Sequence, residues 1–509
     1  MTIHLSLILF WPIALALLGA FAPGRSASVF HVVGALVPLG YAVLLIADYD
    51  TARGGLQYVT DDAWITEMGI RYKLGVDGLN LWLIALTTLL FAASSVWIAL
   101  RPTPRAKLFA LHFGIAETAV LGAFMAQDLA LFVLFFDLML VPFYFLVGQW
   151  GGPDRVAAAV KMVIYTLVGS LLMLAAAVAT AVLSARGGQD LSFVLSDLTQ
   201  RSLPESTQRW LFVAFALAFL IKMPAFPFHG WMPDAYGSMP LPALAVFSGV
   251  VSKVAAYGFL RIALPLLPQP AHDWQTIFLV LALLSIVYGS IQAFTQTNVR
   301  LILGYSSIAQ LGFITLGIFA LDAQGTGAQG ALLQAVNHGL VVAPLFLIFV
   351  LLAERSGGSE DIRDMGGIAT RAPVLATFFL IATFATLAMP GTANFVGEFL
   401  ILLGVFKSET AIALIASVGV VLASVYALRL YIRSMHNRTG PAVAGGDMRL
   451  RDGLVIVPLV LAIVAFALYP QPAVQDGEKA VPAAIRPAVQ AGQSGGAAQQ
   501  TASTAGVTP

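Results

Sequence analysis

Apolar runs of about 20 residues recur along almost the whole chain. A run of that length is what an α-helix needs to cross the hydrocarbon core of a bilayer. We count about fourteen of them between residues 4 and 470. Hydrophobic residues make up 59% of the 509 positions and charged residues only 10%, against about 25% charged in soluble domains. The sequence therefore predicts an all-α polytopic membrane protein.

Two of the predicted spans contain internal breaks, which read KMPAFPFHGWMP at 222–233 and AMPGTANFVG at 388–397. Proline and glycine at mid-span free backbone groups that neighbouring helices or water must satisfy. Each break contains Met-Pro and falls in the fourth span of a five-span block, 109–266 or 275–434. Corresponding broken helices indicate a transporter with internal repeats, although prolines are also simply common in membrane helices. We predict two inverted five-helix repeats, each with one broken helix.

The remaining chain divides into four parts. Residues 1–108 form a predicted three-helix segment, in which 4–22 is a retained first span and the 48–76 loop has alternating stretches typical of a hairpin. A final helix is expected at 453–470, followed by a disordered polar tail at 473–509. Lys and Arg cluster on alternate short loops, which should face the cytoplasm. Both termini would then lie on the outer side of a bacterial inner membrane.

Composition excludes several kinds of chemistry. The chain has no cysteine, so disulfides, thiolate-bound iron–sulfur clusters and a cysteine nucleophile are ruled out. Its seven histidines are scattered without ligand spacing, which argues against a metal or haem site. No phosphate-binding loop, dinucleotide fingerprint or nucleophile elbow occurs. A net charge of +1 gives no reason to expect a nucleic-acid partner. We expect no cofactor in this chain.

Several charged residues stand inside apolar spans, among them Asp137, Lys222 and Lys253. A charge at the bilayer centre costs about 2.5–3.5 kcal/mol on insertion scales. A lysine out of water loses and regains its proton readily, which suits a protein that moves protons. Asp137 can pair with a lysine on a neighbouring helix and set its protonation. It can equally form a static ion pair that fixes helix packing.

Two further ionisable residues in the spans, Glu398 and His338, are main candidates as well, and Glu117 is a secondary one. Glu398 follows the second break and allows the same two interpretations as Asp137, while Glu117 is either functional or merely hydrogen-bonded. His338 can relay protons between Lys253 and Glu398, or serve only as a hydrogen-bond partner between helices.

Four motifs carry a resemblance to a known family: YKLGVDGLNL, KMPAFPFHGWMPDAY, SKVAAYGFLR and MPGTANFVGEF. They resemble the antiporter-like membrane subunits of respiratory complex I over nearly the whole chain apart from the tail. The family's subunits L and N carry a lysine where this chain has Glu398. The resemblance implies a non-redox subunit of a proton-translocating NADH:quinone oxidoreductase. Flavin, iron–sulfur clusters and the quinone site would then lie in partner subunits, and L and N would be neighbours in the lipid bilayer.

Carried over by motif, the family's proton pathway falls on Asp137 and Lys222 as an input pair, Lys253 as the central lysine and Glu398 as the terminal group. Two departures matter. The family usually has glutamate where this chain has Asp137, whose shorter side chain reaches less far towards Lys222. It often has histidine in the tenth span, where this chain has Gln310, which cannot titrate. Minor candidates near these groups are His229, Ser306 and Ser307.

Three alternatives remain open at the level of sequence. The chain could belong to a multisubunit cation/proton antiporter, which shares the two-lysine core but is not redox-driven. It could also belong to a membrane-bound hydrogenase arm. Finally, it could be a passive scaffold that spaces partner subunits, in which case removing its buried charges would leave pumping intact.

Overall fold

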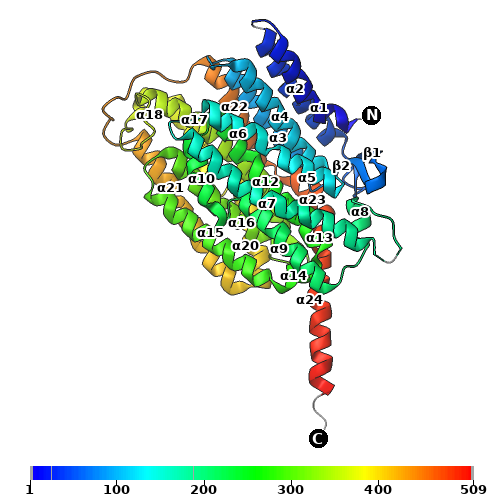
Figure 1. The fold of residues 1–509 in the computed structure, drawn as a ribbon. Helices are drawn as coiled ribbons and strands as arrows, with labels where there is room; N and C mark the ends of the chain where they lie inside the picture. Colours follow the sequence, from blue (N-terminus) through cyan, green and yellow to red (C-terminus); the bar gives the residue numbers. More distant parts are fainter. Residues whose placement is uncertain (1–3, 25, 187, 506–509) are drawn as a thin grey trace.

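The computed structural model describes residues 4–24, 26–186 and 188–505, and they form a bundle of long helices with one small hairpin (Figure 1). Among these residues, eleven helices are long and apolar enough to cross a membrane. Two apolar helices are shorter, α1 (Leu5–Phe21) and α19 (Pro373–Thr386). The predicted all-α membrane class is confirmed, whereas the count of fourteen spans is not.

The N-terminal part contains the hairpin. Its elements are α1, α2 (Ser26–Asp48), β1 (Gln57–Ile65), η1 (Thr66–Met68), β2 (Ile70–Val76) and α3 (Leu81–Ala99). The strands pair antiparallel, with Asp61 opposite Lys73. The Phe193 amide donates to the Gly69 carbonyl at 3.1 Å, so the turn of the hairpin is tied to the segment before α8.

The chain from α4 to α14 contains the first predicted repeat, 109–266, and runs through many short elements. They are α4 (Ala106–Met125), α5 (Leu129–Leu138), α6 (Leu140–Trp150), α7 (Arg155–Ser184), α8 (Leu195–Leu198), α9 (Glu205–Lys222), η2 (Phe228–Trp231), α10 (Met232–Ser238), α11 (Leu241–Val246), η3 (Phe247–Val251), α12 (Ser252–Gly258), η4 (Phe259–Ala263), α13 (Leu264–Leu266) and α14 (Pro268–Asp273). Elements η3 and η4 are π-helical turns within one continuous span, 241–266.

The second predicted repeat and the C-terminal part have longer helices. They are α15 (Gln275–Thr295), α16 (Val299–Ile318), α17 (Thr326–Arg355), α18 (Ile368–Arg371), α19, α20 (Ala393–Ser408), α21 (Thr410–Met435), α22 (Leu450–Leu468), α23 (Gln471–Gly477) and α24 (Ala480–Ala505). The division into repeats remains a prediction.

Both helix breaks lie where the Met-Pro dipeptides predict them. Helix α9 ends at Lys222, one residue before Met223-Pro224, and the chain continues through η2 into α10. Helix α19 ends at Thr386, and α20 begins only at Ala393. Proline cannot donate a backbone hydrogen bond and clashes with the preceding turn, so neither helix can run on through these segments.

The interior of the bundle consists of α16, α17 and the 241–266 span, which are buried almost completely. A helix that is hydrophobic all round belongs in such a core. The outer helices α2, α7, α15, α21 and α22 bury a smaller part of their surface. On α7, Val156 and Ile164 are among the large apolar residues left exposed, which is the surface expected towards lipid.

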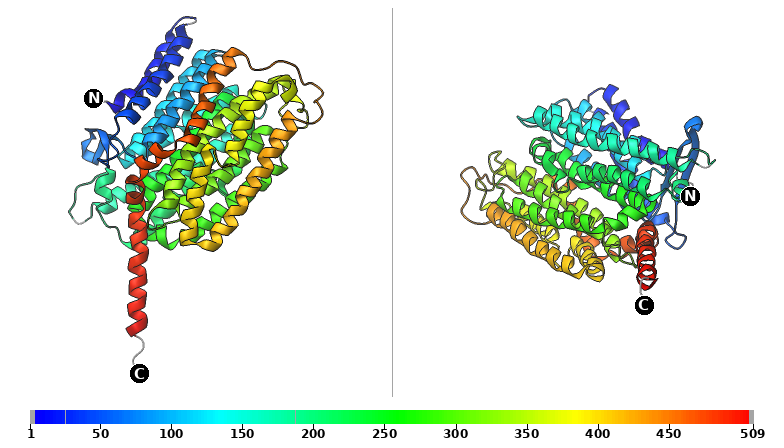
Figure 2. Two further views of the ribbon diagram at one scale, coloured as in Figure 1. Left: turned by 180° about the vertical axis from the view of Figure 1, so that it is seen from behind. Right: turned by 60° about the horizontal axis from the view of Figure 1, so that its bottom comes forward.

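The predicted disordered tail is wrong for most of its length, because α23 and α24 are helical. Val481, Ile485 and Ala488 form a buried face on the first turns of α24, at the spacing of one side of a helix. Helix α24 packs against α13 and α14 and then projects well beyond the bundle (Figures 1 and 2). A short apolar stripe of this kind is easily hidden by the alanine-, glutamine- and glycine-rich composition around it.

Candidate functional site

Lys222 occupies the last turn of α9, where the first break begins, and its side chain is buried. Its Nζ donates to the Phe136 carbonyl at 3.4 Å and lies 4.7 Å from the centre of the Phe136 ring. Asp137 of α5 faces both Lys222 and Ser170. The two charges do not approach within the 4.0 Å of an ion pair, as the short aspartate side chain led us to expect.

Lys253 lies on α12 between the π-helical turns η3 and η4, and it is fully buried. Its Nζ donates to the Ser248 carbonyl at 2.7 Å and lies 2.9 Å from Nδ1 of His338 on α17. Single π-helical turns inside α-helices are frequent at functional sites. Here η3 supplies the carbonyl that holds the lysine amine, and His338 supplies a group that can exchange a proton with it.

The contact between Lys253 and His338 depends on two glycines. A methyl group added at Gly339 would overlap the Gly249 carbonyl oxygen, and one added at Gly249 would overlap the Leu90 side chain. Residue 339 follows the histidine directly, and residue 249 lies one turn before the lysine. The backbones of η3 and α17 therefore touch beside the lysine–histidine contact.

Glu398 lies on α20, after the second break, and is buried within a cluster of amides. Gln310 of α16 donates to Glu398 Oε1 at 2.8 Å. Gln334 of α17 donates to Gln310 Oε1 at 2.7 Å and lies 3.4 Å from the same carboxylate oxygen. Glu398 Oε2 has no protein hydrogen-bond partner among the described residues. Tyr426 of α21 also lies beside Glu398 and Gln310.

Helix α17 connects the lysine end of the site to the glutamate end. Gln334 and His338 are four residues apart, and residues at this spacing lie on the same helix face. The third polar residue of the segment, Asn337, donates to the Ala393 carbonyl at 2.6 Å, at the start of α20. The polar segment of α17 thus contacts Lys253, the amide cluster and the second break. His338 itself makes no hydrogen bond to Glu398.

Comparison with known proteins agrees with this arrangement. Residues 126–423 match the family model described as NADH:quinone oxidoreductase/Mrp antiporter, transmembrane. The chain is 37% identical to NADH-quinone oxidoreductase subunit M of Rhodobacter capsulatus, covering 92% of this chain and 93% of the relative. It is 30% identical to NADH-ubiquinone oxidoreductase chain 4 of Arabidopsis thaliana, covering 92% and 94%.

This chain belongs to the antiporter-like membrane subunits of NADH:quinone oxidoreductase. It also superposes on a chain of respiratory complex I from Thermus thermophilus with a TM-score of 0.86 and 29% identity, covering 95% of this chain and 100% of that one. The family resemblance predicted from the four motifs is confirmed. The protein is a subunit of complex I that works with other membrane subunits, and two relatives named subunit M match 92% and 84% of its length.

Sequence reasoning missed three residues of this antiporter-like subunit's site: Gln334, Asn337 and Tyr426. Two of them had a visible signal, because ALLQAVNHGL is an apolar run in which Gln334 lies one helical turn before His338 and Asn337 lies directly before it. Tyr426 had none, since a single tyrosine in a membrane span is unremarkable.

The secondary candidates Ser306, Ser307, His229 and Glu117, all within the described residues, make no hydrogen bond to Lys222, Lys253 or Glu398. Ser307 Oγ lies 3.4 Å from Ser248 Oγ, near the π-helical turn, while Ser306 donates to the Leu303 carbonyl at 2.8 Å. The His229 ring packs against Tyr288 at 4.7 Å between ring centres, and its Nδ1 has no partner among the described residues. Glu117 is buried in α4, and its Oε1 likewise has no partner within the described part of the chain.

Proposed function

We propose that this complex I subunit carries protons across the membrane through the buried polar groups that run from Asp137 to Glu398. Lys222 would receive a proton under the control of Asp137, Lys253 and His338 would pass it on, and the amide cluster would deliver it to Glu398. The chain breaks no substrate bond in this scheme. The energy would come from quinone reduction in partner subunits.

The observation that carries the proposal is the chain of contacts around α17. Lys253 lies 2.9 Å from His338, one helical turn from Gln334, which is hydrogen-bonded to Gln310 and lies 3.4 Å from Glu398. Buried ionisable residues in a membrane protein mark ion or proton routes because their desolvation is costly. Glutamines cannot titrate, but their oxygen and N–H groups can order the water that bridges one titratable group to the next.

The Asp137–Lys222 pair supports a switch at the input end. Its charges are close enough to interact but are not in contact, so a small helix movement can close or widen the gap. Closing it would raise the lysine's affinity for a proton, and separating it would lower that affinity. Each tenfold change in affinity corresponds to about 1.4 kcal/mol.

The proposed setting follows from topology and from the resemblance. The basic connections would face the cytoplasm of a bacterial cell, with both termini outside. Subunits L and N would be the neighbours in the membrane arm.

The test uses the assembled complex in sealed vesicles, with proton release measured against NADH oxidised. Lys253→Met and Glu398→Gln should each lower the number of protons released per NADH. The matched controls are Lys107→Met and Glu409→Gln, which change exposed residues of the same type. Undiminished proton release in either pathway variant would remove that residue from the route. Undiminished release in both would favour a scaffold role.

A further inference from the structure

We propose that a basic hollow at one end of α21 binds the phosphate of an anionic phospholipid whose acyl chains lie along that helix. The hollow has a volume of about 450 Å³ and lies between the 356–367 segment and the α21–α22 connection. Its lining includes three arginines, Arg363, Arg433 and Arg438, together with the side chains of Asn437 and Thr439. These groups include several of the hydrogen-bond donors that phosphate oxygens accept.

Within the described part of the chain, two of the three arginines in the hollow are not neutralised by a carboxylate. Arg363 is held by Asp361, with its Nη2 2.7 Å from Oδ2 and its Nε 3.0 Å from Oδ1. Arg433 and Arg438 take part in no ion pair with any carboxylate of the described residues. Arg300, at the same end of the bundle, is by contrast paired with Glu360 at 2.7 Å. An anion entering the hollow would therefore meet two guanidinium groups that no protein carboxylate neutralises.

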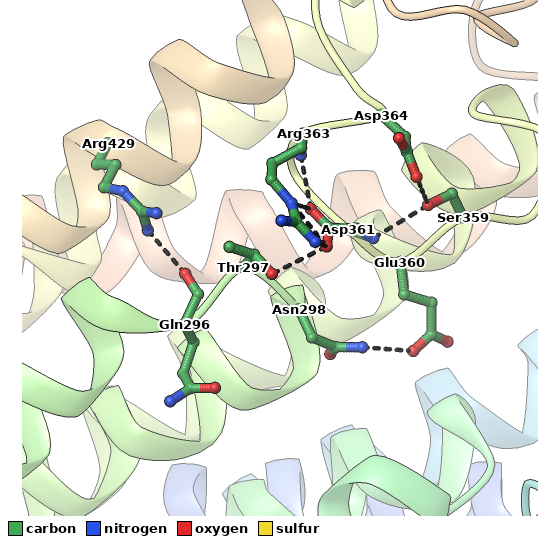
Figure 3. A network of polar contacts seen from close by, with 9 residues as sticks. All are labelled: Gln296, Thr297, Asn298, Ser359, Glu360, Asp361, Arg363, Asp364 and Arg429. Carbon is green, nitrogen blue, oxygen red and sulfur yellow. Dashed lines mark hydrogen bonds and ion pairs between the residues drawn. The ribbon is translucent and has the colours of Figure 1, made fainter.

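The wall of the hollow that carries Arg363 is fixed before any ligand arrives. The Ile362 amide donates to the Thr297 carbonyl at 2.9 Å. The Thr297 hydroxyl donates to Asp361 at 2.9 Å (Figure 3). Arg429, one turn before Arg433, donates to the Gln296 carbonyl at 2.8 Å. These contacts tie both sides of the hollow to the α15–α16 turn. A preformed site loses little conformational entropy on binding.

The surface of α21 identifies the ligand as a lipid rather than a free anion. Apolar side chains along this helix are 44–64% exposed, at Leu414, Val418, Val421, Val425 and Ile432. Their spacing keeps them on one helix face, and the stripe ends at Ile432, next to Arg433. A basic pocket at the membrane surface, continuous with a lipid-facing helix, has the chemistry that anionic headgroups seek.

The experiment uses the assembled complex in nanodiscs that contain phosphatidylglycerol with a photoreactive acyl chain. Cross-links to residues 410–441 should form in the unchanged complex. They should fall about 25-fold in the double variant Arg433→Gln/Arg438→Gln, since each basic residue near a membrane surface contributes about fivefold to affinity. The matched control, Lys107→Gln/Arg155→Gln, removes two exposed charges outside the hollow and should leave the cross-links unchanged.

Three results would overturn the proposal. The first is equal cross-linking in the hollow variant and the control. The second is equal labelling by photoreactive phosphatidylcholine, whose headgroup is neutral overall. The third is loss of the cross-links when inorganic phosphate is added in place of salt of equal ionic strength, which would indicate a free-anion site. The variant Arg433→Lys/Arg438→Lys keeps the charge and should retain most of the binding, which separates headgroup recognition from a folding defect.

Discussion

Nδ1 of His338 lies 2.9 Å from Nζ of Lys253, across the contact between α17 and the span that carries the central lysine. If this contact passes protons, His338→Gln should preserve a hydrogen bond to the lysine yet lower the proton release per NADH, because an amide cannot titrate. The measurement is proton release by the assembled complex in vesicles. Full release in His338→Gln, with loss in His338→Leu, would show that the histidine only positions the lysine.

The glycine contact beside that pair should be intolerant of any side chain. Gly339→Ala places a methyl group against the Gly249 carbonyl, and overpacking of this kind costs about 1–3 kcal/mol. We expect a lower thermal unfolding temperature and reduced proton release from the same variant. Gly40→Ala is the matched control, since a methyl group there meets no atom within 4 Å. Normal stability and proton release in Gly339→Ala would contradict the assignment.

A buried ion pair should anchor the far end of the Lys253 span. Arg261 of η4 lies 2.5 Å from Asp77, and its Nε is 2.9 Å from the Tyr257 hydroxyl. Removing one partner of a buried pair costs about 3–5 kcal/mol, because the other charge is left without compensation. Asp77→Asn and Arg261→Gln should each lower stability strongly in detergent unfolding. The double variant should lose less than the sum of the two, and strict additivity would show that the pair is not coupled.

Lengthening the input carboxylate should close the gap to Lys222. Asp137→Glu adds one methylene group, and we expect a hydrogen bond between the carboxylate and Nζ in an experimental structure of the complex. Asp137→Asn keeps the length but removes the charge, so it should reduce proton release whereas the glutamate variant should not. A glutamate side chain that turns away from Lys222 would refute this account.

The hydrogen bonds that Asp361 accepts in the loop should keep their strength between pH 5 and 8. Hydrogen bonds from Arg363 lower the pKa of Asp361 to about 2. A lowered pKa stabilises the folded state fully above the unfolded value of about 4, and this contribution is lost only as the pH falls towards 2. Hydrogen exchange at the Ile362 amide, corrected for intrinsic rates, should show constant protection from pH 5 to 8. Asp361→Asn should reduce that protection, and a fall in the unchanged chain between pH 7 and 5 would contradict the prediction.

Much of this architecture follows from local chemistry, and the rest depends on tertiary packing. The helix breaks were predictable because proline cannot continue a helix. His338 was predicted to relay protons between Lys253 and Glu398, and it lies against Lys253 but makes no hydrogen bond to Glu398. Gln334 was missed because an uncharged amide in an apolar run gives a weak signal, and its role depends on which helices meet. Helix α24 was not predicted, because the segment is rich in alanine, glutamine and glycine and its apolar stripe, Val481, Ile485 and Ala488, is short.

The π-helical turns on either side of Lys253 have a mechanical consequence. Each one accommodates an extra residue, so the short helix α12 lies between two wide turns of the same span. The far end of that span is anchored by the ion pair of Arg261 with Asp77. An extra residue shifts the register of a helix by about 100°, the angle between successive residues in an α-helix. The wide turn η3 therefore makes the side chains of α12 point in a different direction from the one that an unbroken helix would give them. The direction of the central lysine is in this way set by the turn that precedes it.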